Sequence, residues 1–104
     1  MAQTPKKAYA NISASQTASE VIAAVPFKSI RVVSLACICG STGTNITFNS
    51  STNAITCLIA NGANGGEILS YMFEGWFQTT PGEALTATTG SGSATGVLIN
   101  YLEI

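Results

Sequence analysis

The chain has 104 residues, which suits one domain, and carries a net charge of −1 with only 9% charged residues. Typical globular domains have about 25% charged residues. Neither His nor Asp occurs, so the commonest general base and the usual nucleophile–base pairs are missing. A glutamate pair can serve a glycosidase, but a chain of this size is too small to build a walled cleft around one. We therefore predict a protein that is not an enzyme.

The composition also argues against metal and nucleic-acid binding. Zinc sites use Cys or His in sets of three or four, and the three cysteines contain no C-x-x-C pair. The glutamates are spread singly, unlike the crowded ligands of a calcium loop. Lys6–Lys7 is the only cluster of cations, whereas a nucleic-acid interface needs many cations on one face. We predict no cofactor, no bound metal and no nucleic-acid partner.

The sequence predicts neither a secretion signal nor a membrane anchor. The lysines near the N-terminus are not followed by the apolar segment that a signal peptide requires. The longest nearly apolar stretch, around Ile30–Cys39, is shorter than the roughly 20 residues of a membrane-spanning helix. We therefore expect synthesis in a cytoplasm, where thiols stay reduced. Cys37, Cys39 and Cys57 are interpreted as three small buried hydrophobes.

Short apolar or alternating segments, separated by turns rich in Gly, Pro and Asn, predict strands through most of the chain. In chain order the expected strands are Ala8–Ser15, Glu20–Val25, Ile30–Cys39, Thr44–Phe48, Ala54–Ala60, Gly66–Phe73, a short piece at Trp76–Thr79, Leu85–Thr89 and Gly96–Ile104. The one helix candidate is Ser15–Ala24, where Ser or Thr could cap the first turn. A turn followed by a strand is the alternative there.

Ile30–Cys39 is the strongest strand candidate, because it is apolar on both faces. The two sets are Val33, Leu35, Cys37 and Cys39 on one face, and Ile30, Val32, Ala36 and Ile38 on the other. Apolar residues on both faces are typical of a central strand that is covered on both sides. We therefore expect a layer of protein over each face of this strand.

About eight short strands with a turn every 8–12 residues predict an all-β sandwich or barrel. We expect residues 1–7 to form an N-terminal arm outside the fold and residues 8–104 to form a single domain.

So few charges leave Ser, Thr and Asn to solvate the outer faces of such a fold. Soluble monomers usually carry more Lys and Glu, and uncharged strand edges invite pairing with other chains. One explanation is an obligate oligomer, or a protein that sits on a larger assembly and uses this surface for contacts. The other is a solvated surface rich in Thr, Ser and Gly, as in some binding modules.

Three segments between Val21 and Ile104 carry a resemblance to a known family. They are IRVVSLACICGSTGTNITFNSSTNAITCLIA, then EGWFQTTPGEALTATTGSG, which follows the Gly-rich NGANGG, and the final strand GVLINYLEI. In these segments the chain resembles small β-sandwich decoration, or cement, proteins of tailed bacteriophage capsids.

The resemblance implies a jelly-roll-like β-sandwich that forms a homotrimer on the outer surface of the phage head. Its partner would be the major capsid protein, whose shell it would stabilise against the pressure of the genome. The protein would be a structural part of the virion, assembled onto the capsid in the host cytoplasm. Similar sandwiches occur in phage tails and fibres, so a module that recognises carbohydrate or a host surface is the alternative function.

Five residues are candidates for an interface with neighbouring chains: Lys6, Lys7, Phe73, Trp76 and Phe77. Adjacent strand residues point to opposite faces, so one of Trp76 and Phe77 would belong to the core and the other to an interface. Both are core residues in the alternative interpretation. The two lysines would dock the arm onto an acidic capsid surface, unless the arm is only a solvated, disordered tip. No catalytic residue is predicted.

Overall fold

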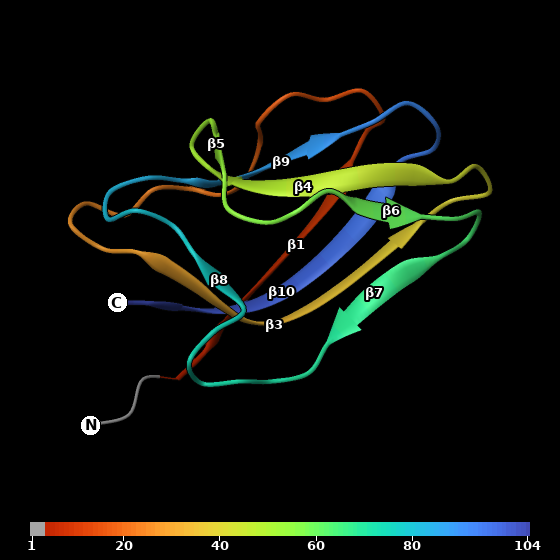
Figure 1. The fold of residues 1–104 in the computed structure, drawn as a ribbon. Helices are drawn as coiled ribbons and strands as arrows, with labels where there is room; N and C mark the ends of the chain where they lie inside the picture. The colour runs from red at the N-terminus through yellow and green to blue at the C-terminus, as the bar shows by residue number, and fades with distance from the viewer. Residues whose placement is uncertain (1–3) are drawn as a thin grey trace.

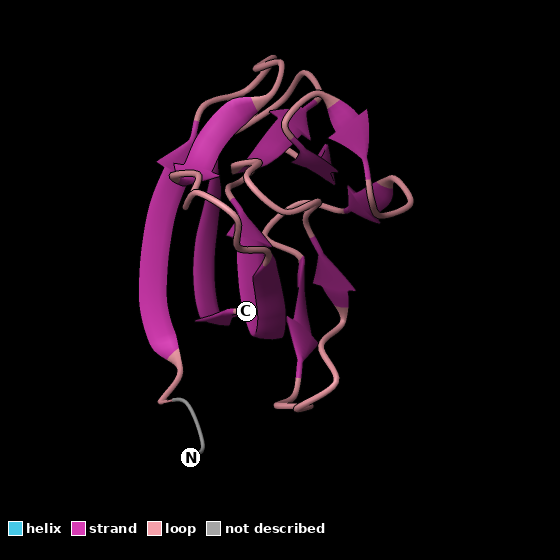
Figure 2. Cartoon of the chain, turned by 90° about the vertical axis from the view of Figure 1, so that its left-hand side faces the viewer, coloured by secondary structure: helices cyan, strands magenta, loops and turns pink. Residues whose placement is uncertain are grey.

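Ten short β-strands make up the regular structure of residues 4–104, the part of the chain that this computed structural model describes (Figure 1). In chain order they are β1 (Lys6–Ile12), β2 (Ser19–Ile22), β3 (Ile30–Cys39), β4 (Thr44–Ser50), β5 (Asn53–Ala54), β6 (Ile59–Asn61), β7 (Gly66–Leu69), β8 (Phe77–Gln78), β9 (Leu85–Thr89) and β10 (Thr95–Glu103). Residues 4–104 contain no helix (Figure 2). The helix considered at Ser15–Ala24 is therefore wrong, and the alternative of a turn followed by a strand is confirmed by β2. Its β-branched Val21 and Ile22 favour the extended chain.

The strands form two antiparallel sheets, which confirms the predicted all-β class and is compatible with a sandwich. One sheet, named sheet A, has the order β1-β10-β3-β7, and β8 also pairs with β3. The other, named sheet B, has the order β2-β9-β4-β5, and β6 also pairs with β4. The pairing is nested: β1 pairs with the last strand, β2 with β9, β3 with β7 and β8, and β4 with β5 and β6.

The bounds of β3 and β9 are as predicted, whereas the middle of the chain differs from the expectation. The predicted strand Ala54–Ala60 is interrupted, and only its two ends pair with β4, as β5 and β6. The predicted strand Gly66–Phe73 ends at Leu69. Residues 59–61 and 66–69 therefore lie at sheet edges and are joined by irregular chain, which opens the structure between β6 and β7.

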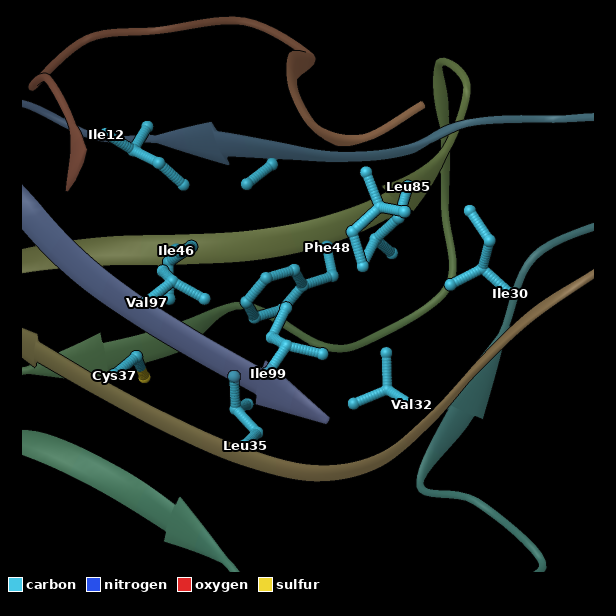
Figure 3. Packing of buried hydrophobic residues seen from close by; sticks show 12 residues of the cluster. Ile12, Ile30, Val32, Leu35, Cys37, Ile46, Phe48, Leu85, Val97 and Ile99 are labelled. Atoms are coloured by element: carbon cyan, nitrogen blue, oxygen red, sulfur yellow. The ribbon is translucent and has the colours of Figure 1, made fainter. Parts of the chain in front are cut away.

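The hydrophobic core lies between the two sheets. Phe48 of β4 is its largest fully buried side chain, and the ring points from sheet B toward β10 and β3 of sheet A (Figure 3). This ring stacks on that of Phe77, with the ring centroids 5.2 Å apart. The buried cluster consists of Ile12, Ile22, Ile30, Val32, Leu35, Cys37, Ile46, Phe48, Leu85, Ala87, Val97 and Ile99. Within a regular strand these are alternate residues, as burial of one face requires.

An extra residue in β3 decides which of its side chains face this core. Ser34 pairs with Asn100 of β10, but the next pair joins Val32 to Tyr101, so Val33 is left out of the register. Such a β-bulge shifts the alternation of side chains by one position. Val32 and Leu35 can therefore both belong to the core cluster, although they are three positions apart and would face opposite ways in a regular strand.

The prediction that Ile30–Cys39 is covered on both faces is wrong for the part of the strand beyond the bulge. Beyond the bulge, Leu35 and Cys37 face the core, so Ala36 and Ile38 between and after them face outward. Ile38 is 57% exposed. The outer face of β3 is therefore at the surface around Ala36 and Ile38, whereas Val33 at the bulge is fully buried although it lies outside the core cluster.

Strand pairing begins two residues earlier than the expected boundary between an arm and the domain. Lys6 and Lys7 belong to β1 and pair with Tyr101 and Asn100 of β10. Pro5 precedes the strand and has no N–H to donate to the ladder, so the strand begins directly after it. Residues 1–3 of the predicted arm lie outside the described residues.

The core assignment predicts a large loss of stability for Phe48→Ala. Removing a buried aromatic ring leaves a cavity and should lower the free energy of unfolding by about 3–5 kcal/mol. Urea denaturation measures this loss. Tyr9→Ala, at a side chain that is 81% exposed, should cost less than about 1 kcal/mol. Equal losses in the two variants would contradict the assignment of Phe48 to the core.

Candidate functional site

The outer face of sheet A carries a continuous row of apolar side chains. The register places Tyr9 of β1 beside Leu98 of β10. Leu98 in turn lies beside Ala36 of β3, and Ala36 lies beside Ile68 of β7. The exposed fractions are 81% for Tyr9, 53% for Leu98 and 77% for Ile68. Together with Ile38, which follows on the same face of β3, these residues are named the apolar face.

One row beside the apolar row is polar with a single charge, whereas the row on the other side contains Ile38 and carries no charge. In the polar row Lys7, Asn100 and Ser34 pair in register, and the Asn100 amide donates a hydrogen bond of 2.8 Å to the Ser34 hydroxyl. On the other side Asn11 lies beside Gly96. The largest contiguous apolar patch on a soluble monomer is often functional, and interface centres are depleted of charge. The apolar face is therefore a candidate docking surface for another protein.

A hollow of about 480 Å³ opens between the edges of the two sheets. Residues 55–60 of the sheet B side line one wall, and Glu67, Leu69, Trp76 and Phe77 line the other. Its walls are mostly apolar, and Glu67 supplies the one carboxylate. The single ion pair among residues 4–104 does not involve Glu67. This site, named the edge hollow, has the chemistry to receive an apolar group that is followed by a cation.

The structure separates Trp76 and Phe77 in burial, as the alternation of a strand predicts. Phe77 is partly buried and packs on the core through its stack with Phe48. Trp76 is 43% exposed, and its indole Nε1–H donates a hydrogen bond of 2.7 Å to the Ser70 carbonyl. Both side chains line the edge hollow. An interface role for either residue stays a prediction.

Phe73 lies apart from the edge hollow, on the chain between β7 and β8. Its ring is 56% exposed, and the Arg31 guanidinium carbon lies 5.8 Å from the ring centroid, which is a cation–π distance. Arg31 also donates hydrogen bonds to the Phe73 carbonyl and, through Nε, to the Gln78 side chain. Arg31 thus holds an exposed aromatic ring in place.

Lys6 and Lys7 do not act as a pair, because alternation along β1 points them to opposite faces. Lys6 Nζ lies 2.8 Å from a carboxylate oxygen of Glu103, and this hydrogen bond and the negative charge raise the pKa of Lys6. Lys7 lies on the same face of β1 as Tyr9, beside the apolar face. Of the two lysines predicted to dock the protein, Lys7 is the one next to the candidate docking surface.

The prediction of three buried cysteines is wrong for Cys57. All three thiols are free, and Cys37 and Cys39 are buried in β3. Burial raises the pKa of Cys37. Cys57 is exposed and lines the edge hollow, because the strand expected around it is interrupted there.

Sequence reasoning missed both the apolar face and the edge hollow. Two features of the sequence pointed to the apolar face. Tyr9 alternates with Ala8 and Ala10, and the residues of β3 that face outward are apolar. The edge hollow could not be found in this way, because only the nested strand pairing brings residues 55–60 next to Glu67, Leu69 and Trp76.

Two classes of site are absent from residues 4–104. No group of three or more His, Cys, Asp or Glu side chains is placed to hold a metal ion. No helix in this part of the chain has the length and apolarity to cross a membrane.

No protein-family model, curated protein or solved structure matches the chain. The functional argument therefore depends on the two surfaces described above.

The burial of the cysteines predicts their reactivity with a thiol reagent. At pH 8 the native protein should react rapidly at Cys57 only, because Cys37 and Cys39 are shielded and a raised pKa lowers the thiolate fraction of Cys37. Mass spectrometry after timed iodoacetamide treatment locates the labels. In urea all three should react. Rapid labelling of Cys37 in the native protein would contradict the packing of β3.

Proposed function

We propose that the protein is a non-enzymatic structural component of a virion. It is a decoration, or cement, protein that binds the major capsid protein on the outer surface of a phage head and stabilises the shell. The observation that carries this proposal is the apolar face. Its row of apolar side chains crosses four strands, and the large side chains Tyr9, Leu98 and Ile68 within it are exposed. Such a face is suited to docking on another protein.

The nested strand pairing supports a jelly roll as the finer description of the fold. Sheet A takes β1, β10, β3 and β7, and sheet B takes β2, β9, β4 and β5, so the chain runs back and forth between the sheets. Double-sheet jelly rolls recur in viral capsid proteins and in lectins. The fold thus suits a virion protein, although fold alone does not assign a function.

The proposed assembly is a homotrimer on the capsid surface, put together in the host cytoplasm. Three subunits that each bind one copy of the shell protein gain avidity, because a first contact raises the effective concentration for the next. Weak docking through each apolar face is then sufficient for tight binding of the trimer.

A carbohydrate-binding module of a phage tail or fibre is the second candidate, and the edge hollow favours it. Trp76 offers a partly exposed aromatic surface, and the Glu67 carboxylate can accept hydrogen bonds from sugar hydroxyls. Retention on a glycan array, lost in Trp76→Ala, would favour this function over capsid decoration.

Cosedimentation with empty capsids of the phage that encodes the chain tests the first proposal. The wild-type protein should pellet with the capsids, and Leu98→Glu should lower its affinity at least tenfold, because a charge would be buried in an apolar contact. Asn45→Glu is the matched control, since it places the same charge at an exposed position on β4 of sheet B. Equal binding of the two variants would contradict docking through the apolar face.

A further inference from the structure

An exposed aromatic residue occupies a turn position that normally takes glycine. The Lys28 N–H donates a hydrogen bond of 3.1 Å to the Val25 carbonyl, which closes a β-turn with Pro26 and Phe27 in the middle. Phe27 has a φ of 65°, and a turn of this kind favours Gly at that position. The Phe27 side chain is 94% exposed. Burial of the ring therefore does not offset the strain of the backbone.

The turn is held firmly by the rest of the fold. The Gly82 N–H donates a hydrogen bond of 2.9 Å to the Lys28 carbonyl. Ser29 and Ile104 exchange two backbone hydrogen bonds of 2.8 and 2.9 Å directly after the turn. A strained, solvent-facing aromatic on a fixed support is typical of a binding residue, because strain is retained where it serves a contact. Such support also lowers the entropy lost on binding.

The edge hollow has the matching shape and charge. Its apolar wall, with Leu69, Trp76 and Phe77, suits a phenyl ring, and its carboxylate, Glu67, suits the lysine next to that ring. Neither Lys28 nor Glu67 takes part in the one ion pair found in the described residues, Lys6–Glu103. The two sites thus complement each other in both apolar character and charge.

Within one copy the two sites do not meet. In Figure 1 the segment between β2 and β3 forms the left-hand extremity of the molecule, β6 and β7 lie on the right, and β8, whose Phe77 lines the hollow, lies between them. No residue of the turn lines the edge hollow. The turn of one copy therefore does not fill the hollow of that same copy, and an occupant of this chemistry would come from a second molecule.

We propose that Phe27 of one copy inserts into the edge hollow of a second copy, with Lys28 beside Glu67. The contact is heterologous, because it joins two different patches, and such contacts build closed rings when the rotation between copies closes. This inference rests on the proposed function for its self-association, and it supplies the contact that would close the trimer. The apolar face takes no part in it and stays free to dock on a capsid.

Light scattering of the purified protein tests this contact without a capsid. The wild type should have a mass near three chains at micromolar concentration, and Phe27→Ala should raise the dissociation constant at least about tenfold, as for a central aromatic anchor. Tyr71→Ala is the matched control, because it removes an exposed aromatic side chain that belongs to neither the edge hollow nor the apolar face, and it should leave the mass unchanged. A monomeric wild type, or an unchanged Phe27→Ala assembly, would overturn the proposal.

Phe27→Gly separates the loss of the ring from the strain of the turn. Both Phe27→Gly and Phe27→Ala remove the ring, but only glycine relieves the positive φ. Both variants should lose self-association, and the glycine variant should unfold at a higher urea concentration than the alanine variant. A glycine variant that assembles like the wild type would overturn the proposal.

A charge exchange tests the orientation of the contact. Lys28→Glu and Glu67→Lys should each weaken self-association, and the double variant should recover most of the wild-type affinity because the opposite charges are restored. No recovery in the double variant would overturn the pairing of Lys28 with Glu67. Capsid binding is scored separately: if the mass responds as described but the wild type does not pellet with capsids, the decoration function alone fails.

Discussion

The pairing of β3 with β10, with Val33 bulged out of its register, is the constraint on which the rest of the structure depends. These two long strands lie in the middle of sheet A, and every other strand of that sheet pairs with one of them. The bulge turns Val32 and Leu35 to the same side, where both contribute to the cluster around Phe48. In an unbulged strand one of these two side chains would leave the core, since neighbours at odd spacing face opposite ways.

The same register determines what the protein presents to its surroundings. Once Leu35 and Cys37 face the core, Ala36 and Ile38 must face outward, and the partners of Ala36 in neighbouring strands are Leu98 and Ile68. The outer face of sheet A is therefore apolar as a consequence of how the core is built. The short strands at the edges of the two sheets leave the edge hollow as a second surface. The proposed function would use these two surfaces separately, the edge hollow for copies of the chain and the apolar face for the capsid.

Much of the fold follows from local sequence patterns. Strong β-formers fix the bounds of β3, and Pro81-Gly82 forms the expected turn, in which the Glu83 N–H bonds to the Thr80 carbonyl. Alternation correctly separates partly buried Phe77 from more exposed Trp76. These features depend on residues that are close in sequence, so periodicity and turn chemistry are sufficient to predict them.

The remaining features depend on contacts between distant segments. The bulge at Val33 is visible only against β10, and without it the apolar pattern of β3 wrongly indicates two covered faces along the whole strand. The exposure of Cys57 follows from an interruption of the strand between β5 and β6. The exposed Phe27 was not predicted either, because its positive φ arises in a turn whose sequence, Val-Pro-Phe-Lys, contains no glycine to signal it.

Oxidative footprinting of the protein, free and bound to empty capsids, tests the central claim most directly. Hydroxyl radicals modify exposed aromatic and aliphatic side chains, and mass spectrometry measures the extent at each residue. Docking through the apolar face predicts that modification of Tyr9, Ile68 and Leu98 falls together when the protein binds the capsid. Unchanged modification of these three residues in the bound protein would contradict the account.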